Sequence, residues 1–555
     1  MKYIVITGGV ISGIGKGITS TSIGFLLQSM GYNITMIKID PYLNVDSGTI
    51  SPFEHGECFV LADGGECDLD LGNYERFLNI ELTKDHNITT GKIYKNVIEK
   101  ERRGDYLGAT VQIVPHITDE IIDHISRVSK LPINNKIPDI CIIELGGTVG
   151  DIEILPFVEA IQQMKALTDD DFCFVHVAMA ICNQEVKTKP IQHSLATIRQ
   201  RGIFPDLLVI RGENMISDEI KHKLRRLCQI DVKDIIGNPN VKTIYHVPAV
   251  FYSQNICDRI GKKLKLEIYP IESPYKDVLL YFENVYKSDF STLCMSKSLD
   301  ESELKSLHSI KIGIVGKYIG SPDTYLSLTR TIEHTAFYLN VNIIIEWIDS
   351  ENINQDILSK CNGFIIPGGF GFRGINGKLF IAEYARENKM PILGICLGMQ
   401  IMVVDCFNFF SGKKGISTEW IENDIQNTFE KVIDILPEQT GIKGGTMRLG
   451  NYDTILESSK VKDMYNASLI VERHRHRYEF NNNYIDKLGD LKCVGKSIST
   501  NGNTLVEVVE LNNHPFYIGC QYHPEYISTL NKPHPLFIGL FETIMDINMD
   551  KLLTI

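Results

Sequence analysis

Short apolar runs alternate with longer amphipathic stretches along the first half of the chain. Runs rich in valine and isoleucine occur at residues 3–7, 34–39, 140–144, 172–178 and 207–211, with helix-like segments between them. Continuous apolar runs of this length predict strands that are buried on both faces, and their alternation with helices predicts βαβ units in a parallel sheet. We therefore expect an α/β domain over residues 1–270.

The pattern changes after residue 270 and then resumes. Pro274, a helix-like piece over 276–285 and a stretch rich in Ser, Lys and Glu predict a connector at 271–308. A second strand series begins at 311–315 and continues at 343–348, 363–366 and 392–395. We expect a second α/β domain over 309–555, again with a mostly parallel sheet flanked by helices. Two domains also suit the length, since 555 residues are too many for one hydrophobic core.

Composition and charge exclude several classes of protein. The 43% hydrophobic and 23% charged residues are ordinary for a globular protein. A net charge of −13 argues against a general nucleic-acid binder. We expect no membrane partner, because the longest apolar run, at 172–182, falls well short of the roughly 20 residues of a membrane span. The 13 cysteines lack CxxC spacing, and the chain starts in a strand without a signal segment, so we expect a cytoplasmic protein with reduced thiols.

The first predicted strand runs directly into a glycine-rich loop with one lysine. Residues 8–17 read GGVISGIGKG, an arrangement that turns backbone N–H groups and a helix N-terminus toward a phosphate. Lys16 adds a mobile positive charge. The Walker A pattern is not met, because Val10 stands at its first glycine position and Gly17 follows the lysine in place of Ser or Thr. The loop predicts nucleotide binding; the alternative is a glycine turn needed only for strand–helix packing.

Other polar segments of this half follow predicted strands. Glu144 ends an apolar strand, which is a usual position for a magnesium ligand, and Asp70 is a candidate second ligand. Alternatively, these carboxylates cap helices or lie in solvent. The glycine-rich run 146–153 indicates backbone close to a ligand. Residues 187–192 offer two cations for a triphosphate, although such a segment is more often a solvated basic loop.

The second half carries the pattern of a cysteine nucleophile. A strand ends at Cys396 in a glycine turn, which holds the sulfur at a helix N-terminus and favours the thiolate. His523 supplies a base and Glu525 a group that orients it. Residues 367–371, PGGFG, can present backbone N–H groups to an oxyanion. A single cysteine in a glycine turn is usually structural, but these motifs in this order predict a cysteine hydrolase.

Taken together, the motifs resemble those of the CTP synthases, glutamine-dependent enzymes that aminate UTP. The matching stretches are 38–46, 51–57, 68–77, 101–112, 144–153 and 187–192, and the glutaminase motifs extend the match to 534–537. The resemblance implies a P-loop-like amidoligase domain of the dethiobiotin-synthetase type, followed by a class I glutamine amidotransferase domain. It also implies that ATP phosphorylates the C4 oxygen of UTP, that ammonia from glutamine displaces it, and that CTP, ADP, phosphate and glutamate are the products.

The resemblance further implies a role for individual residues. For ATP it implies Gly13, Ile14, Gly15, Lys16, Gly17, Ile18 and Asp70, with Lys16 and Lys38 also catalytic and Mg²⁺ held by Asp70 and Glu144. For UTP and the product CTP it implies Ser12, Asp151, Ile152, Glu153, Lys187, Thr188, Lys189, Pro190, Ile191, Gln192 and Lys223. For glutamine it implies Gly369, Leu397, Gly398, Met399, Gln400, Glu419 and Arg477 around the catalytic Cys396, His523 and Glu525. His55 matches a residue of the ammonia passage.

The resemblance also implies partners and regulation. GTP is expected as an allosteric activator, CTP as a feedback inhibitor, and a homotetramer as the assembly, with filaments as known for the family. Two alternatives stay open. A cobyrinate-type glutamine-dependent amidoligase shares both domain classes but aminates carboxylates, so it has no use for the nucleotide set at 151–153 and 187–192. A regulatory scaffold with vestigial sites is the non-enzymatic alternative, and the intact Cys396, His523 and Lys16 argue against it.

Overall fold

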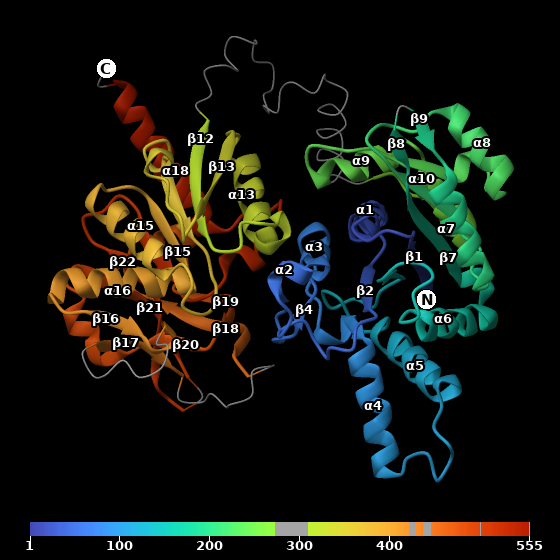
Figure 1. The fold of residues 1–555 in the computed structure, drawn as a ribbon, viewed down its shortest axis with the longest axis horizontal. Coiled ribbons are helices and arrows are strands. Elements are labelled where there is room, and N and C mark those ends of the chain that lie inside the picture. The colour runs from blue at the N-terminus through green and yellow to red at the C-terminus, as the bar shows by residue number, and fades with distance from the viewer. Residues whose placement is uncertain (184, 272–308, 421–428, 437–445, 500, 554–555) are drawn as a thin grey trace. The chain divides into compact units, whose positions relative to one another are not determined.

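The computed structural model describes residues 1–183, 185–271, 309–420, 429–436, 446–499 and 501–553 (Figure 1). The predicted connector lies outside the described residues, apart from Ile271. The chain divides into two compact units, the first made of Met1–Ser47 and Asn73–Thr292 and the second of Gly48–Gly72 and Leu293–Ile555. The boundaries drawn at 270 and 309 stay a prediction. The packing shows in addition that a short segment from the N-terminal half, Gly48–Gly72, belongs with the second unit.

The first unit is built on a seven-stranded sheet in the order β11-β10-β7-β1-β6-β2-β5, and all its paired strands are parallel. Its strands are β1 Lys2–Gly8, β2 Ile34–Asp40, β5 Asn87–Thr89, β6 Ile140–Leu145, β7 Phe172–Met179, β10 Leu207–Arg211 and β11 Ile235–Asn238, and a separate hairpin joins β8 Ile181–Asn183 to β9 Glu185–Lys187. The five strands predicted in this half are therefore confirmed. The short edge strands β5 and β11 were not predicted.

Helices cover both faces of this sheet (Figure 1). They are α1 Lys16–Ser29, α3 Leu69–Leu78, α4 Thr90–Arg103, α5 Thr118–Val128, α6 Leu155–Leu167, α7 Lys189–Gln200, α8 Asp218–Cys228, α9 Val247–Tyr252 and α10 Ile256–Leu264. Successive side chains of a strand point to opposite faces, so Tyr3 and Val5 pack in one cluster with Ile121 of α5 and Phe157 of α6. The helix α1 packs directly on β1 and β6. It begins at Lys16, near the end of the glycine-rich loop 8–17, which we call the phosphate loop.

The second unit has a nine-stranded mixed sheet in the order β13-β12-β14-β15-β23-β22-β21-β18-β19. The strands are β12 Ile310–Gly316, β13 Ile343–Asp349, β14 Gly363–Ile366, β15 Ile392–Ile395, β18 Arg448–Leu456, β19 Leu469–His476, β21 Leu491–Ile498, β22 Thr504–Leu511 and β23 Tyr517–Cys520. From β13 to β23 the neighbours are parallel, as expected, and the α/β class is confirmed for this half too. The remaining four strands extend the sheet in antiparallel fashion, which the sequence did not predict.

Smaller elements complete this unit. A three-stranded sheet holds β16 Gly415–Ser417, β17 Glu430–Ile435 and β20 Tyr478–Phe480, and a hairpin holds β3 Phe59–Val60 and β4 Glu66–Cys67. The helices are α2 Pro52–His55, α13 Leu326–Leu339, α14 Gln355–Leu358, α15 Ile375–Glu387, α16 Leu397–Ser411, α17 Lys460–Tyr465 and α18 Pro535–Leu553. Across the described residues of both units, no helix has the length and apolar character needed to cross a membrane.

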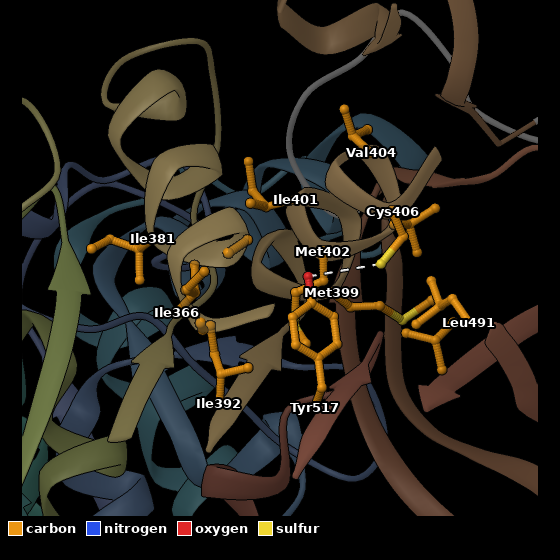
Figure 2. Close-up of a cluster of buried hydrophobic side chains, with 14 of the residues drawn as sticks. Ile366, Ile381, Ile392, Met399, Ile401, Met402, Val404, Cys406, Leu491 and Tyr517 are labelled. Carbon is orange, nitrogen blue, oxygen red and sulfur yellow. Dashed lines mark hydrogen bonds between the residues drawn. The ribbon is translucent and has the colours of Figure 1, made fainter. Parts of the chain in front are cut away.

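The helix α16 is fixed by an apolar core on one face of the large sheet (Figure 2). Its Met399, Met402 and Cys406 pack with Ile381 of α15 and with Tyr517 of β23, whose hydroxyl oxygen lies 3.9 Å from the Cys406 sulfur. The opposite face is covered by α13 and α18. Because α16 is buried along its first three turns, the residue at its N-terminus is held rigidly.

Residues 48–72 pack within the second unit although they come from the N-terminal half of the chain. Arg473 of β19 is buried and donates to the carbonyl oxygen of Val60 at 3.1 Å, and Arg475 pairs with the Glu66 carboxylate at 3.0 Å. The hydroxyl of Tyr526 donates to the Cys58 carbonyl at 3.2 Å. Polar groups of β19 thus hold the β3–β4 hairpin in place.

Replacing Glu66 with alanine should destabilise the second unit strongly. The Glu66 side chain is 1% exposed and that of Arg475 is 14% exposed, so the substitution would leave a buried guanidinium without its counter-charge. Breaking such a buried pair costs about 3–5 kcal/mol. Denaturant unfolding should show this loss. Glu457→Ala is the matched control, because the Lys496–Glu457 pair is 36% and 55% exposed and should contribute little. Equal effects of the two substitutions would contradict the prediction.

Candidate active sites

Cys396 stands at a sharp turn between β15 and α16. Its backbone has φ 53° and ψ −103°, a conformation that L-residues rarely adopt, and its side chain is almost fully buried. The flanking glycines permit this turn. A Cβ at Gly394 would lie 2.3 Å from the Met402 sulfur, and one at Gly398 would lie 2.0 Å from the Ile366 carbonyl oxygen. The turn places the sulfur at the N-terminus of a 15-residue helix, as a strand–elbow–helix nucleophile requires.

His523 and Glu525 follow the neighbouring strand β23. The Nδ1 atom of His523 lies 2.7 Å from Glu525 Oε1, and its ring stacks on that of Tyr526 with centroids 4.8 Å apart. Burial lowers the pKa of His523, but the negative charges of Glu525 and Cys396 outweigh it and raise that pKa to about 10. The Nε2 atom is buried and has no hydrogen-bond partner among the described residues. A Glu-oriented imidazole with a free Nε2 is suited to exchange a proton with a neighbouring thiol.

A cavity of about 180 Å³ joins these groups. Cys396, His523 and Glu525 line it together with Tyr318, Tyr325, Arg475, Tyr526 and the loop residues Pro367, Gly368, Gly369 and Phe370. Part of its wall comes from Gly48, Thr49, Ile50, Pro52, Glu57 and Cys58. His55 of α2 does not appear in the lining as far as the chain is described, and its Nδ1 lies 3.9 Å from Asp68 Oδ2. The cavity is therefore built from segments that lie far apart in the sequence.

The other residues assigned to glutamine binding lie near this cavity, and each makes different contacts. A Cβ on Gly369 would be 3.4 Å from the Leu397 side chain, so Gly369 adjoins the first turn of α16, which also holds Gly398 and Met399. Glu419 Oε1 accepts the Gly371 N–H at 2.8 Å. Burial raises the Glu419 pKa, while Gly371, Lys317 and Arg477 act in the opposite direction.

Two of the residues assigned to glutamine binding form hydrogen bonds with other groups of the protein. Arg477 donates to the Thr446 hydroxyl at 3.0 Å. Gln400 is buried and donates to the Tyr478 carbonyl at 3.0 Å and to Gln521 Oε1 at 3.2 Å, so it supports the pocket from behind. The sequence assigned no role to Gln521, whose side-chain N–H₂ lies 3.7 Å from the Cys396 sulfur. Its place two residues before His523 was the signal that could have identified it.

A methyl group on Gly368 should disable the cysteine site selectively. A Cβ there would lie 2.8 Å from His523 Cε1 and 3.6 Å from Cys396 Cβ, so Gly368→Ala must displace the imidazole. A displacement of that kind costs on the order of 100-fold in rate. We expect such a loss in glutamine-dependent turnover with ammonia-dependent turnover unchanged. Gly320→Ala is the control, since its Cβ would meet only the Phe53 ring at 3.9 Å; an equal loss there would contradict the interpretation.

In the first unit, the loop after β1 has the geometry of a phosphate site. Gly13 and Gly15 have φ of 69° and 85°, where a side chain would be strained, and Gly15 leaves the N-terminus of α1 without a side-chain cap. Lys16 folds back over Gly8, where a Cβ would lie 2.7 Å from its Cδ atom, and donates to the Gly147 carbonyl at 2.7 Å. A helix N-terminus without a side-chain cap, beside a lysine, is suited to bind an anion.

A buried charged cluster lies on β2 and β6. The Lys38 ammonium donates to Glu144 Oε1 at 2.9 Å and lies 3.7 Å from Asp40, and the Tyr74 hydroxyl donates to Glu144 Oε2. Each oxygen of Glu144 accepts one bond, and each can accept a second. Asp70 lies in the first turn of α3. A carboxylate with free acceptor capacity suits Mg²⁺, which usually completes its shell with phosphate and water, so Glu144 fits the predicted ion. Asp70 packs with the second unit, so its pairing with Glu144 stays a prediction.

The structure brings three of the predicted nucleotide segments together. The Val149 N–H donates to the Gly9 carbonyl at 3.3 Å, and a Cβ on Gly9 would lie 3.2 Å from Ser194 Oγ of α7. His176 of β7 bridges Thr7 and Ser194 through its two ring nitrogens. The loops after β1 and β6 therefore adjoin α7, the helix that follows Lys187 and Thr188.

The single residues assigned to UTP lie on these elements. Asp151 accepts from the Thr148 N–H at 3.1 Å, Ile152 is 79% exposed, and Glu153 and Ser12 are exposed. Thr188 stands at the N-cap position of α7, and its hydroxyl accepts from the Gln192 side chain at 3.0 Å. Lys189, Pro190 and Ile191 form the first turn of that helix. Lys223 is exposed on α8, which packs against α7.

These two units define a class of protein. A cysteine elbow with a His–Glu pair at the carboxyl edge of a mixed sheet is the arrangement of a cysteine hydrolase. A parallel sheet with a lysine-bearing phosphate loop and buried carboxylates at the same edge is that of a nucleotide-dependent enzyme. The chain combines the two.

The comparisons with known proteins agree with this class. Residues 2–266 match the family model for the CTP synthase N-terminus, and residues 321–543 match that for class I glutamine amidotransferases. The CTP synthase of Methanoculleus marisnigri is 44% identical over 98% of this chain and 98% of its own length. That of Caldanaerobacter subterraneus is 42% identical over 99% of both. The acivicin-bound glutaminase domain of Trypanosoma brucei CTPS is 33% identical over 43% of this chain and 94% of its own, with a TM-score of 0.39.

The chain belongs to the CTP synthase family. It is therefore an enzyme, a glutamine-hydrolysing carbon–nitrogen ligase of pyrimidine biosynthesis that forms CTP from UTP with ATP as co-substrate.

Proposed function

We propose that this chain makes CTP by two coupled reactions, one at the Cys396 site and one at the phosphate loop. The observation that carries the proposal is that a complete Cys–His–Glu arrangement and a lysine-bearing phosphate loop occur in one chain. Hydrolysis of an amide yields ammonia, and a nucleotide-dependent ligase can use it.

The cysteine site releases the ammonia. The Cys396 sulfur attacks the side-chain amide carbon of glutamine, and a backbone N–H of the 367–371 loop and that of Leu397 receive the developing oxyanion. Protonated His523 then delivers its Nε2 proton to the leaving nitrogen, and Glu525 holds the imidazole at Nδ1. Water hydrolyses the thioester to glutamate and restores the thiol. Glu419 and Arg477 would bind the amino and carboxylate groups of glutamine by charge.

The phosphate-loop site activates UTP. The oxygen at C4 is a poor leaving group; transfer of the γ-phosphoryl group of ATP converts it into a good one. Ammonia then attacks C4, phosphate leaves with the former C4 oxygen, and the net reaction yields CTP, ADP, phosphate and glutamate. Lys16 and Lys38 would stabilise the charge on the transferring group, and Mg²⁺, held by Asp70 and Glu144, would neutralise phosphate charge.

The nucleotide specificity would come from the segments beside α7. Lys187, Lys189 and Lys223 offer charges for a triphosphate, while Ser12, Asp151, Glu153 and Gln192 offer hydrogen bonds to the nucleoside. CTP retains the triphosphate, so it can compete for the same site and inhibit. A closed path past His55 is also proposed, because ammonia is mostly protonated at neutral pH and ammonium is no nucleophile. GTP activation, a homotetramer and filaments complete the proposal.

The test measures CTP formation from UTP, ATP and Mg²⁺ with either glutamine or ammonium chloride. We expect both nitrogen sources to yield CTP, and GTP to stimulate the glutamine branch. If the folded protein formed no CTP with ammonium chloride, that result would contradict the proposed synthase reaction. Amidation of a polycarboxylate instead would identify the cobyrinate-type alternative.

A further inference from the structure

Two buried lysines lie behind the oxyanion loop, as we term residues 367–371. Lys378 of α15 is 0% exposed, and Lys317, which directly follows β12, is 4% exposed. Lysine is rarely buried so completely. The mechanism proposed above uses neither residue.

The ammonium groups hold the carbonyl side of the loop. Lys378 Nζ donates to the Pro367 carbonyl at 3.2 Å, and Lys317 Nζ donates to those of Phe370 and Gly371. In a planar trans peptide the N–H points away from the carbonyl, so the Gly368 N–H faces away from Lys378. The same holds for the peptide between Phe370 and Gly371. Its carbonyl accepts from Lys317, and its N–H points the other way and donates to Glu419.

The other side of the loop touches the catalytic pair. Gly368 faces the His523 ring and the Cys396 Cβ, so closely that a Cβ on it would overlap His523. The loop is thus held between lysine ammonium groups and the Cys396–His523 pair. A shift of Pro367 would move Gly368 against the imidazole.

The charge of Lys378 also acts on the cysteine site. Burial lowers the pKa of Lys378 to about 7, and the charge of Lys317 acts in the same direction, while a negative charge on Cys396 raises it. This coupling is reciprocal: if the thiolate favours the ammonium, the ammonium favours the thiolate to the same extent. A methionine would fill the same space without the cost of burying a charge, so packing alone gives no reason for a lysine here.

We propose that Lys378 is a positioning residue of the glutaminase reaction. Its ammonium group fixes the oxyanion loop against His523 and supports the negative charge on the Cys396 sulfur. The inference rests on the proposed roles of Cys396 and His523. Lys317 holds the other end of the loop, but its charge also acts on Glu419, so Lys378 gives the cleaner test.

The experiment compares Lys378→Met and Lys378→Gln with the wild-type enzyme. For Lys378→Met we expect glutamine-dependent kcat to fall about 10- to 100-fold, with a smaller change in glutamine KM and unchanged ammonia-dependent turnover. Iodoacetamide should alkylate Cys396 more slowly in this variant, because the sulfur loses the nearby positive charge of Lys378. Lys378→Gln keeps a donor for Pro367, so it should recover part of kcat but not the alkylation rate.

Lys460→Met is the matched control, because Lys460 also donates to two backbone carbonyls, those of His514 at 2.7 Å and Pro515 at 3.1 Å. It should leave alkylation and glutamine use unchanged. Wild-type kcat and alkylation in both Lys378 variants would overturn the inference, as would an equal loss with glutamine and ammonia. If Cys396→Ala retained glutamine-dependent turnover, the proposed function itself would fail, and this inference with it.

Discussion

Replacing Cys396 with alanine should abolish CTP formation from glutamine and leave formation from ammonium chloride intact. The sulfur is the atom that would form the thioester, and alanine places no nucleophilic atom at this turn. Removal of the nucleophile from a catalytic triad costs on the order of 10⁶-fold in kcat, because the remaining groups act only together with it. Steady-state CTP formation with each nitrogen source, with glutamate release measured in parallel, gives the result directly.

The matched control is Cys406→Ala on the same helix. Cys406 is also buried, but it lies in the apolar core three turns into α16 and contacts Tyr517 (Figure 2). Its replacement should lower stability modestly and change neither nitrogen source's kcat. Loss of the ammonia reaction in Cys396→Ala, with the fold preserved, would mean that the cysteine also serves the synthase reaction and would contradict the division into two sites.

Replacing Lys16 with methionine should abolish CTP formation from both nitrogen sources. The lysine bends over Gly8 at the N-terminus of α1, which has no side-chain cap, and the phosphates of ATP are proposed to bind there. Losing one charged group that stabilises the transition state costs about 10²–10³-fold. Both nitrogen sources would share the proposed phosphorylation step, so turnover with each should fall together. Ammonia-dependent turnover at saturating ATP measures the loss without any contribution from glutaminase.

Lys92→Met is the control for this prediction. Lys92 lies in the same unit and also donates to backbone carbonyls, those of Lys84 at 3.0 Å and Asn87 at 2.9 Å. Its loss should affect stability more than kcat. Thiol alkylation of Cys396 should be unaffected in Lys16→Met. A Lys16 variant that retained ammonia-dependent kcat would show that this loop binds no reacting phosphate.

The features that the sequence predicted well are local. The phosphate loop and the cysteine elbow are each defined by glycines within a few residues of the reactive side chain, and the positive φ at Gly13, Gly15 and Cys396 shows the physical need for them. The parallel strands were also predictable, because burial on both faces requires an uninterrupted apolar run. Strands such as β18 and β19 were missed, since they alternate buried and exposed positions and carry several charges.

The features that the sequence did not predict depend on contacts between distant residues. Nothing local to Val60 or Arg473 indicates that they meet, since they are 413 positions apart. Lys378 was overlooked for a different reason: a lysine in an amphipathic helix is expected to face solvent, and only the packing of α15 behind the oxyanion loop shows otherwise.

The placement of residues 48–72 has a practical meaning for dissecting this enzyme. A fragment that starts after the connector would carry Cys396 and His523 but not Val60 or Glu66, so the guanidinium groups of Arg473 and Arg475 would lose their partners. It would also lack the stretch from Gly48 to Cys58 that forms part of the cavity wall. The border of the glutaminase therefore does not coincide with the predicted connector, and a faithful half-enzyme needs the missing 25 residues, 48–72, supplied as a graft or a second peptide.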